Sequence, residues 1–313
     1  MMDLFEKNIF RVGGLLLLTF HATAHSASLN PANPWGIRMD IGYTYDDNVS
    51  RSSESKLSDN IFSLNLSKGA VVPVSEHTRL LFNGLLGAEK FGTHTGLGRA
   101  FAGIHGELMY RASGEFSTPT WAIFGRAFAD EYQSALRDGY RFSGGVSARK
   151  PVTDRVTLIG ALARNVRKAE SSVFDTKDTA LRMNLDYAVT SSGTLYASGE
   201  HRRGDIVFSM KSDVTGVGDT HQLDDALTGV TGVPYTAAVH LGSGSTSSGT
   251  QYFGYRIQGK TALITLGYNL AFGSRSSLDL SWRRVRSTPD AQAGYTPPNY
   301  TSNQYFIAYL MTF

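Results

Sequence analysis

The chain has 313 residues, enough for one large all-β domain of the barrel type. It contains no cysteine, which excludes a disulfide framework, a cysteine-ligated zinc site and a thiol nucleophile. Its 30 Lys and Arg against 27 Asp and Glu give a net charge of +3, too small to indicate nucleic-acid binding.

Residues 1–24 have the pattern of an export signal peptide. Lys7 and Arg11 form a charged start, residues 12–20 form an apolar core too short to span a membrane, and Ala22-Thr-Ala24 is a small-x-small cleavage site. Beyond this segment no run of about 18 apolar residues follows, so the remainder, 25–313, predicts no transmembrane helix. A chain of such low hydropathy can span a bilayer only as a closed β-barrel, in which every backbone group is paired.

Residues 37–45 predict the first strand, because side chains of a strand point alternately to its two faces. One face carries Ile37, Met39, Ile41, Tyr43 and Tyr45, and the other carries Arg38, Asp40 and Thr44. In a barrel the first set would face lipid and the second would face the interior.

The same rhythm continues along the chain. It predicts strands at 61–72, 79–91, 99–111, 120–132, 139–149, 155–167, 179–188 and 194–205. A Gly/Ser/Thr-rich segment, about 207–250, reads as a loop. A strand is expected again from Gln251. Its outward-facing residues change from odd positions (Tyr255, Ile257) to even positions (Ile264, Leu266), which predicts a bulge near Gly259. A tight turn at 273–276 joins this strand to the next one. A loop at 287–302 then leads to the closing strand.

The predicted strands number about twelve, and their connections sort into two sets. Every second connection is short: 73–78, 112–119, 150–154, 189–193 and 273–276. The alternate set contains the longest segments: 46–60, 207–250 and 287–302. This predicts short periplasmic turns and long extracellular loops, and aromatic residues near the strand ends fit the interfacial girdles of such a barrel.

The last eleven residues end on an aromatic side chain. Tyr305, Ile307, Tyr309, Met311 and Phe313 share one face of the predicted strand. This stretch resembles the closing strand of Gram-negative outer-membrane β-barrels, a family in which a C-terminal Phe after alternating hydrophobics is the assembly signal. The resemblance implies the bacterial outer membrane as location, with its lipid and lipopolysaccharide and the barrel-assembly machinery as partners. The alternative is a hydrophobic strand of a soluble β-sandwich.

A second resemblance lies in Gly42-Tyr-Thr-Tyr-Asp-Asp-Asn-Val-Ser-Arg51. This run is similar to the opening strand and loop of the barrel part of surface lipoprotein assembly modifiers, and of barrels attached to polysaccharide-export systems. It implies a possible periplasmic export partner. The helical-repeat domain of those modifiers has no room here, because the first strand begins soon after the predicted cleavage site.

Charged residues concentrate on the predicted inner faces, because charge facing lipid costs about 2–4 kcal/mol at the midplane. The expected lumen-lining residues are Arg38, Asp40, Arg79, Glu89, His105, Glu107, Arg126, Asp130, Arg141, Arg149, Arg182, Asp186, Arg256, Asp279 and Arg283, joined by Glu200, Arg202 and Lys260. Two interpretations stay open: a network of ion pairs that fills and stiffens the barrel, or a narrow basic pore that favours small anionic solutes.

Signals for catalysis and cofactors are weak. The histidines show no metal-binding spacing, and no nucleotide or phosphate-loop motif is present, so no metal or cofactor is expected. Outer-membrane lipases work with Ser and His; His105 lies near Glu107 on one face, but no activated-Ser motif accompanies it. Asp46, Asp47 and Asn48 could bind calcium, with a solvated acidic loop as the other interpretation.

The sequence therefore predicts an all-β protein, a single transmembrane antiparallel up-and-down barrel of about twelve strands. The predicted function is a small porin-like channel with a mixed, slightly basic lumen, or a structural barrel. The alternatives are a barrel partner in the export of a surface lipoprotein or polysaccharide, and a lipid-modifying enzyme.

Overall fold

The structure is a computed structural model, and it describes residues 36–54, 56–213, 250–291 and 298–313. The predicted signal peptide, 1–24, lies outside the described residues. The strands are β1 (Ile37–Asp46), β2 (Asp59–Pro73), β3 (Thr78–Phe91), β4 (Arg99–Arg111), β5 (Thr120–Tyr132), β6 (Gly139–Pro151), β7 (Val156–Ala169), β8 (Thr176–Ala188), β9 (Gly193–Asp213), β10 (Thr250–Phe272), β11 (Ser276–Pro289) and β12 (Tyr300–Thr312). Three 3-10 turns lie between strands: η1 (Thr95–Leu97), η2 (Ala135–Arg137) and η3 (Ser172–Phe174).

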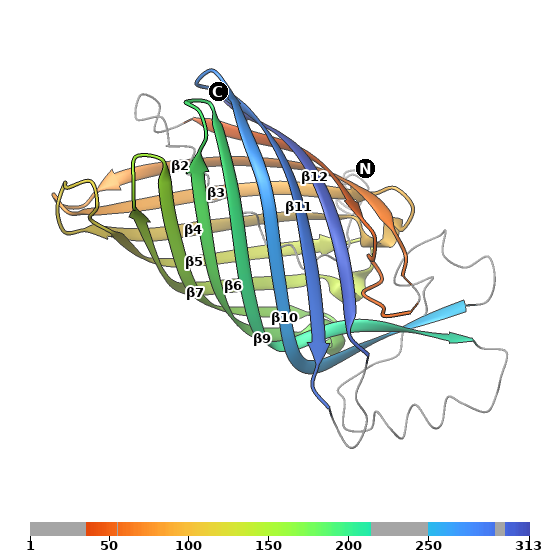
Figure 1. The fold of residues 1–313 in the computed structure, drawn as a ribbon. Helices are drawn as coiled ribbons and strands as arrows, with labels where there is room; N and C mark the ends of the chain where they lie inside the picture. The colour runs from red at the N-terminus through yellow and green to blue at the C-terminus, as the bar shows by residue number, and fades with distance from the viewer. Residues whose placement is uncertain (1–35, 55, 214–249, 292–297) are drawn as a thin grey trace, which may run out of the picture.

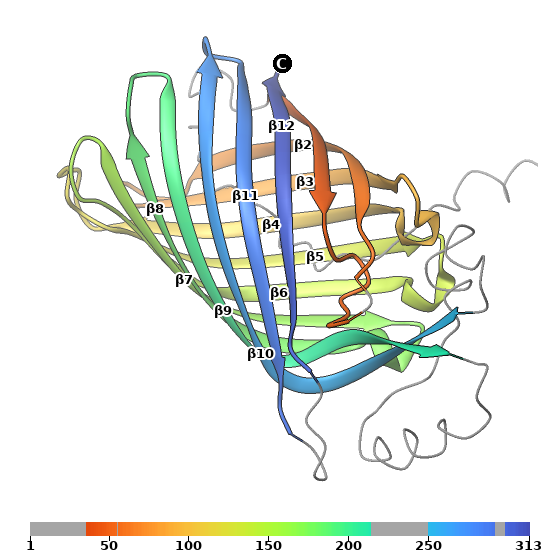
Figure 2. The same cartoon turned by 45° about the vertical axis from the view of Figure 1, so that its right-hand side comes forward.

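Each strand pairs antiparallel with its sequence neighbours, and β1 pairs with β12 to close the barrel (Figures 1 and 2). The closing ladder runs from Arg38 opposite Thr312 to Asp46 opposite Gln304. The predicted fold, an up-and-down antiparallel barrel of twelve strands, is confirmed. Among the described residues, no helix is long and apolar enough to cross a membrane.

The two ends of the barrel differ in their connections. The turns at 74–77, 112–119, 152–155, 189–192 and 273–275 share one end with the C-terminus, where Phe313 N–H donates to the carbonyl of Ile37 at 2.8 Å. The connections at 47–58, 92–98, 133–138 and 170–175 lie at the opposite end. Two predicted loops were too long, because β9 continues to Asp213 and β12 already begins at Tyr300. The sorting of short and long connections otherwise follows the sequence prediction.

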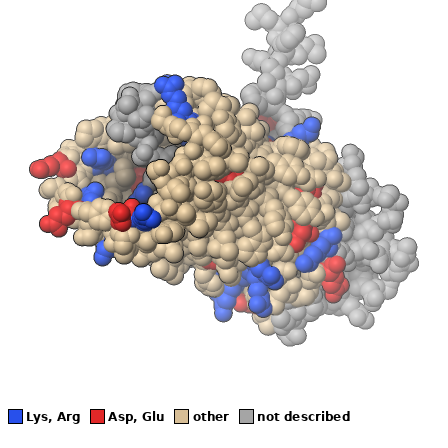
Figure 3. Space-filling model, turned by 45° about the horizontal axis from the view of Figure 1, so that its top comes forward, with Lys and Arg blue, Asp and Glu red and all other residues tan. Residues whose placement is uncertain are grey.

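The outer face is apolar along most of the barrel length. Residues directly opposite each other in a ladder project from the same face. Ile41 pairs with Leu64, and Tyr43 pairs with Phe62, whose ring lies edge-on at 5.2 Å. These side chains stay exposed, Phe62 to 55%. Figure 3 shows charged side chains gathered toward the barrel ends with a mostly uncharged band between them. Such a broad apolar band requires an apolar surrounding.

The predicted bulge near Gly259 is wrong. Pairing of β10 runs without a break from Thr250 to Leu270 along β9, and from Gly259 along β11. Instead, the pairing of β9 with β8 ends at Gly204 and that of β10 with β11 ends at Gly259. Beyond these residues β9 and β10 continue as a two-stranded ribbon that bends away from the neighbouring strands (Figure 2). Gly204 has φ +151°, and a Cβ there would lie 2.2 Å from the carbonyl oxygen of Lys177. Glycine is therefore required at this bend.

Candidate functional site

The register places fourteen of the fifteen expected lumen-lining residues on the inner face. They are Arg38, Asp40, Arg79, Glu89, His105, Glu107, Arg126, Asp130, Arg141, Arg149, Arg182, Asp186, Asp279 and Arg283. Glu200 and Arg202 join them. They form separate groups rather than one continuous lining.

Two expected positions differ. Lys260 pairs with Arg203 and Thr288 on the outer face and is exposed. Arg256 lies beyond the bend at Gly259, and its guanidinium donates to the carbonyl of Asp175 at 2.5 Å, so it does not line the lumen. Both errors come from the predicted bulge. Because β10 has no bulge, its inward and outward side chains alternate without interruption through Gly259, and Ile257 is buried on the inner side.

One group of charges joins β3, β4, β5 and β6, and we name it the β3–β6 network. Arg99 donates to both Glu89 oxygens at 3.0 and 3.1 Å and to Asp130 at 3.1 Å. Arg141 also binds Asp130, with one bond at 2.7 Å. Two bases face two acids, so this network is neutral as a whole and is held by fully paired side chains.

Arg99 was missed by the sequence analysis although it is fully buried. Arg99 is an even number of residues from His105 and Glu107, so it lies on the same inner face. The apolar Phe101 on that face made the face look less charged than it is. The ring of Phe101 in fact lies under the Arg99 guanidinium at 4.9 Å. An aromatic ring on the inner face thus covers the cation rather than facing lipid.

A second group, the arginine cluster, consists of Arg126, Arg182, Arg202 and Arg283 around Glu200. Arg182 donates to Glu200 at 2.6 Å, and Arg202 binds the other carboxylate oxygen. Arg283 lies within electrostatic reach of Arg182, Arg202 and Glu200, and its Nε donates to Thr265 at 3.3 Å. The four arginines come from β5, β8, β9 and β11, so they surround the lumen instead of following one strand pair.

Arg126 differs from the other members of the cluster. Among the described residues, no hydrogen bond or ion pair of its guanidinium is found; it lies over the Phe124 ring at 5.1 Å. The charges within reach are Arg182 and Glu107. Counting Glu107, Glu200 and Asp178 against four arginines leaves an excess of one positive charge around this part of the lumen.

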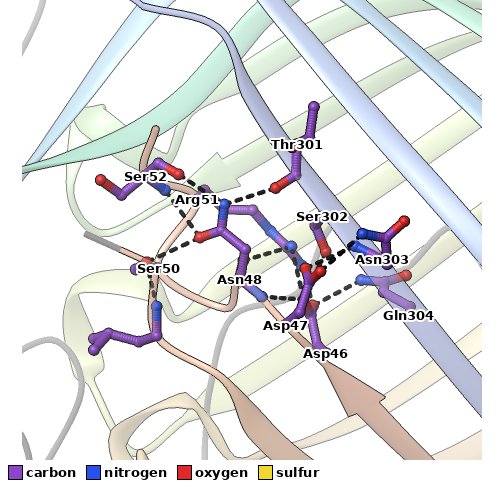
Figure 4. A network of polar contacts seen from close by, with 11 residues as sticks. Asp46, Asp47, Asn48, Ser50, Arg51, Ser52, Thr301, Ser302, Asn303 and Gln304 are labelled. Carbon is purple, nitrogen blue, oxygen red and sulfur yellow. Dashed lines mark hydrogen bonds and ion pairs between the residues drawn. The ribbon is translucent and has the colours of Figure 1, made fainter. Parts of the chain in front are cut away.

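The loop after β1 folds inward at the opposite end from the short turns (Figure 4). Asp46 is fully buried and accepts from Arg51 at 2.8 Å, from Ser302 at 2.6 Å and from Gln304 at 2.7 Å. Burial alone would lower the pKa of Arg51, but Asp46, Tyr300 and Asp47 together outweigh it and raise that pKa. Neither a solvated acidic loop nor a calcium site describes this arrangement, because protein donors already occupy the Asp46 carboxylate.

The β9–β10 ribbon, residues 205–213 and 250–258, narrows the same mouth. The Ser209 N–H donates to the carbonyl of Arg51 at 3.3 Å, which links the ribbon to the inward loop. Val207 packs on Val173 and Phe174 of η3. Beneath the ribbon lies a small cavity of about 30 Å³, whose lining includes Arg51, Arg202, Arg283, Asp178, Tyr300 and Gln304. The interior therefore narrows between the arginine cluster and the mouth on the side of residues 47–58.

The predicted enzyme residues do not form a nucleophile and base. His105 Nε2 lies 3.8 Å from Glu107, and its partners across the ladders are Asn83 and Arg126. In the described part of the chain, no three His, Asp or Glu side chains gather as a metal site would require. Among the described residues, those beside His105 are Glu107, Asn83 and Arg126, and none of them is a serine nucleophile.

The remaining predicted residues lie at the two ends of the barrel. Arg38 and Asp40 pair at 2.9 Å near the short turns. The terminal set Tyr305, Ile307, Tyr309 and Met311 lies on the outer face, paired with Tyr45, Tyr43, Ile41 and Met39. The last strand thus completes the lipid-facing surface where the barrel closes.

No protein-family model matches this sequence, and no curated protein matches it. Among solved structures, an outer-membrane channel from Pseudomonas putida F1 has a TM-score of 0.54 at 10% identity, covering 89% of this chain and 96% of that one. The KdgM porin in complex with oligogalacturonate has a TM-score of 0.43 at 10% identity, covering 88% and 99%. The NanC porin has a TM-score of 0.42 at 7% identity, covering 87% and 98%. At these identities the similarity shows the fold alone, which is that of outer-membrane β-barrels.

Proposed function

We propose that this protein is a narrow channel of the bacterial outer membrane that favours small anionic solutes. The observation that carries the proposal is the arginine cluster, in which four arginines from four strands face one lumen. Rings of fixed charge set the selectivity of a pore. Here the nearby carboxylates, Glu107, Glu200 and Asp178, neutralise only part of the positive charge.

The location follows from the outer face. A closed barrel leaves no unpaired sheet edge in hydrocarbon, and its apolar exterior satisfies the bilayer. We place the 47–58 connection outside the cell and the short turns in the periplasm. The C-terminal aromatic supports recognition by the barrel-assembly machinery, and the predicted signal peptide supports export.

The inward loops support a constricted channel rather than a wide pore. Arg51 and Ser209 join two segments across the extracellular mouth, and Phe174 lies beneath the Arg137 guanidinium at 4.0 Å. A solute must pass between these contacts and the arginine cluster. We expect this path to admit small anions and to exclude large folded or polymeric cargo. The export role and the lipid-modifying role therefore have no specific support in the geometry.

Single-channel recording in planar bilayers tests the proposal. The informative variant is Arg126→Gln, because this guanidinium carries positive charge without a hydrogen bond that the barrel needs. The matched control is Arg284→Gln, which removes the same charge from the outer face of β11. Wild-type protein should show stepwise currents with anion preference in a salt gradient.

The magnitude follows from Coulomb's law. One unit charge about 6 Å from a passing ion changes the energies of an anion and of a cation by ~0.7 kcal/mol each, in opposite directions, in water. The difference of ~1.4 kcal/mol changes the anion-to-cation permeability ratio about tenfold. Arg126→Gln should lower the ratio by about this factor, and Arg284→Gln should leave it unchanged. A barrel that folds but passes no current would reject the channel and leave a structural barrel filled by its ion pairs.

A further inference from the structure

A row of basic side chains crosses the outer face of the barrel near its extracellular end. The ladders place Arg164, Thr179, Arg203, Lys260 and Thr288 directly side by side on β7, β8, β9, β10 and β11. One step toward the membrane, Arg286 lies opposite Ala262. Partners in a ladder are about 5 Å apart. Arg203, Lys260 and Arg286 can therefore reach one common anion.

These residues are exposed to the surroundings of the barrel, not to its lumen. We define the outer basic patch as Arg164, Lys168, Lys177, Arg203, Lys260, Arg284 and Arg286, all of them exposed. The acidic residues on the same surface are Asp175, Asp205 and Asp290. Seven basic against three acidic residues leave a net charge of +4.

Part of this charge is already paired within the protein. Arg203 binds Asp290 at 2.7 Å, and Lys168 binds Asp175 at 2.7 Å. Arg164 donates to Thr179 at 2.9 Å. Among the described residues, no ion-pair partner is found for Lys177, Lys260, Arg284 or Arg286. The unpaired charge therefore concentrates on β8, β10 and β11.

The patch lies at the level where lipid headgroups begin. On β10 the outward residues Tyr268 and Lys260 are eight positions apart, about 26 Å along the strand or ~20 Å across the membrane at a tilt of about 40°. That height is close to the apolar band of about 25 Å. Outward Trp282 and Tyr305 pair directly below Arg284, as aromatic residues do at a membrane interface. A cation above this girdle meets phosphate rather than hydrocarbon.

The other side of the barrel lacks this feature. At the same end of β2 to β5, the outward positions are Asn60, Ala88, Lys90, Ala100, Ala129 and Glu131. One base and one acid cancel there. The positive charge on β7 to β11 is therefore confined to one side and is not a general property of the rim.

We propose that the outer basic patch binds the phosphorylated glucosamine headgroup of lipid A in the outer leaflet. The proposal rests on the outer-membrane location given above but not on channel activity. The row from β7 to β11 spans four strand intervals, about 19 Å, which is wide enough for both phosphates of one lipid. Arginine and lysine bind phosphate through charge-assisted hydrogen bonds.

Titration of delipidated full-length protein in detergent, read by native mass spectrometry, tests the patch. The probes are bis-phosphorylated lipid A, phosphatidylglycerol and inorganic pyrophosphate. The test variant is Lys260→Gln with Arg286→Gln. The matched control is Lys68→Gln with Lys150→Gln, two exposed outward lysines on β2 and β6 near the opposite end. Heat-dependent gel mobility verifies that every variant is folded.

Wild type should bind lipid A more tightly than phosphatidylglycerol, and equimolar pyrophosphate should not displace it. Near a membrane surface each basic residue contributes about fivefold in affinity, so the test variant should weaken binding about 20- to 30-fold. The control variant should stay within twofold of wild type.

Three results with the lipid probes would overturn the proposal, and a fourth with pyrophosphate. They are an unchanged affinity of the test variant, an equal loss in the control variant, and equal affinity for lipid A and phosphatidylglycerol. Displacement by pyrophosphate would show a site for free phosphate and would also overturn it. Because these substitutions leave the lumen intact, conductance tests the channel separately.

Discussion

Glu200 offers the sharpest test of the barrel interior, because its substitution should change stability and selectivity in opposite directions. Its side chain is 4% exposed, and it binds Arg182 and Arg202, whose side chains are 26% and 13% exposed. Glu200→Gln leaves both guanidinium groups without their carboxylate. Removing one partner of a buried pair costs about 3–5 kcal/mol. Because Arg182 is partly hydrated, we expect the lower end, ~3 kcal/mol.

The same change adds one positive charge to the lumen. At about 6 Å from a passing ion this charge stabilises an anion and destabilises a cation by ~0.7 kcal/mol each in water. The anion-to-cation permeability ratio should therefore rise about tenfold. Urea unfolding in lipid vesicles measures the stability. With a slope of about 3 kcal/mol per molar, the unfolding midpoint should fall by ~1 M. Planar-bilayer reversal potentials measure the selectivity.

The double variant Glu200→Gln with Arg182→Met is the control, because it removes one charge of each sign. Its selectivity should return to that of wild type, and much of its stability should return as well. A loss of stability without any change in selectivity would refute the proposed anion-selective channel. Glu200 would then serve only to hold Arg182 and Arg202 in place. An unchanged midpoint would refute the buried contacts themselves.

Three further predictions concern the extracellular end. Asp46→Asn should cost about 3 kcal/mol and expose residues 47–58 to limited proteolysis. Asp47→Asn keeps an oxygen that can accept from Asn303 and should change proteolysis less; equal cleavage would contradict the role of Asp46 in holding this loop. Gly204→Ala should lower unfolding stability by ~2 kcal/mol or more because of its positive φ and its contact with a backbone oxygen, while Gly199→Ala, with open space around its Cβ, should stay within about 0.5 kcal/mol. Burial raises the pKa of Asp175, but its hydrogen bonds from Lys168 and Ala169 outweigh this and set the pKa below its usual 3.8. This contribution to the free energy of unfolding, about 0.5 kcal/mol, is complete above the unfolded pKa and is lost as pH falls through the folded pKa. Asp175→Asn should therefore be less stable than wild type at neutral pH and equally stable in acid, as measured by urea titrations.

The exposed outer surface and the charged interior were both readable from local alternation. Arg38 and Asp40 against Met39 and Ile41 already define the two faces of β1, because side-chain direction repeats every two residues whatever the strand pairs with. The strand number and the short turns followed from the same pattern. Hydrocarbon outside and water inside impose that pattern on every strand.

Tertiary structure alone decided which charges meet. Arg126 and Arg182 approach each other because β5 and β8 face a common lumen, a distance set by closure and register rather than by sequence spacing. The fate of the 47–58 loop was likewise hidden, since the partners of Asp46 are Ser302 and Gln304 at the far end of the chain. The facing of Arg256 was missed because β10 keeps one alternation through Gly259, which only the pairing with β9 reveals. Alternation is a local property and survives in the sequence; contacts between distant strands exist only once the barrel has closed.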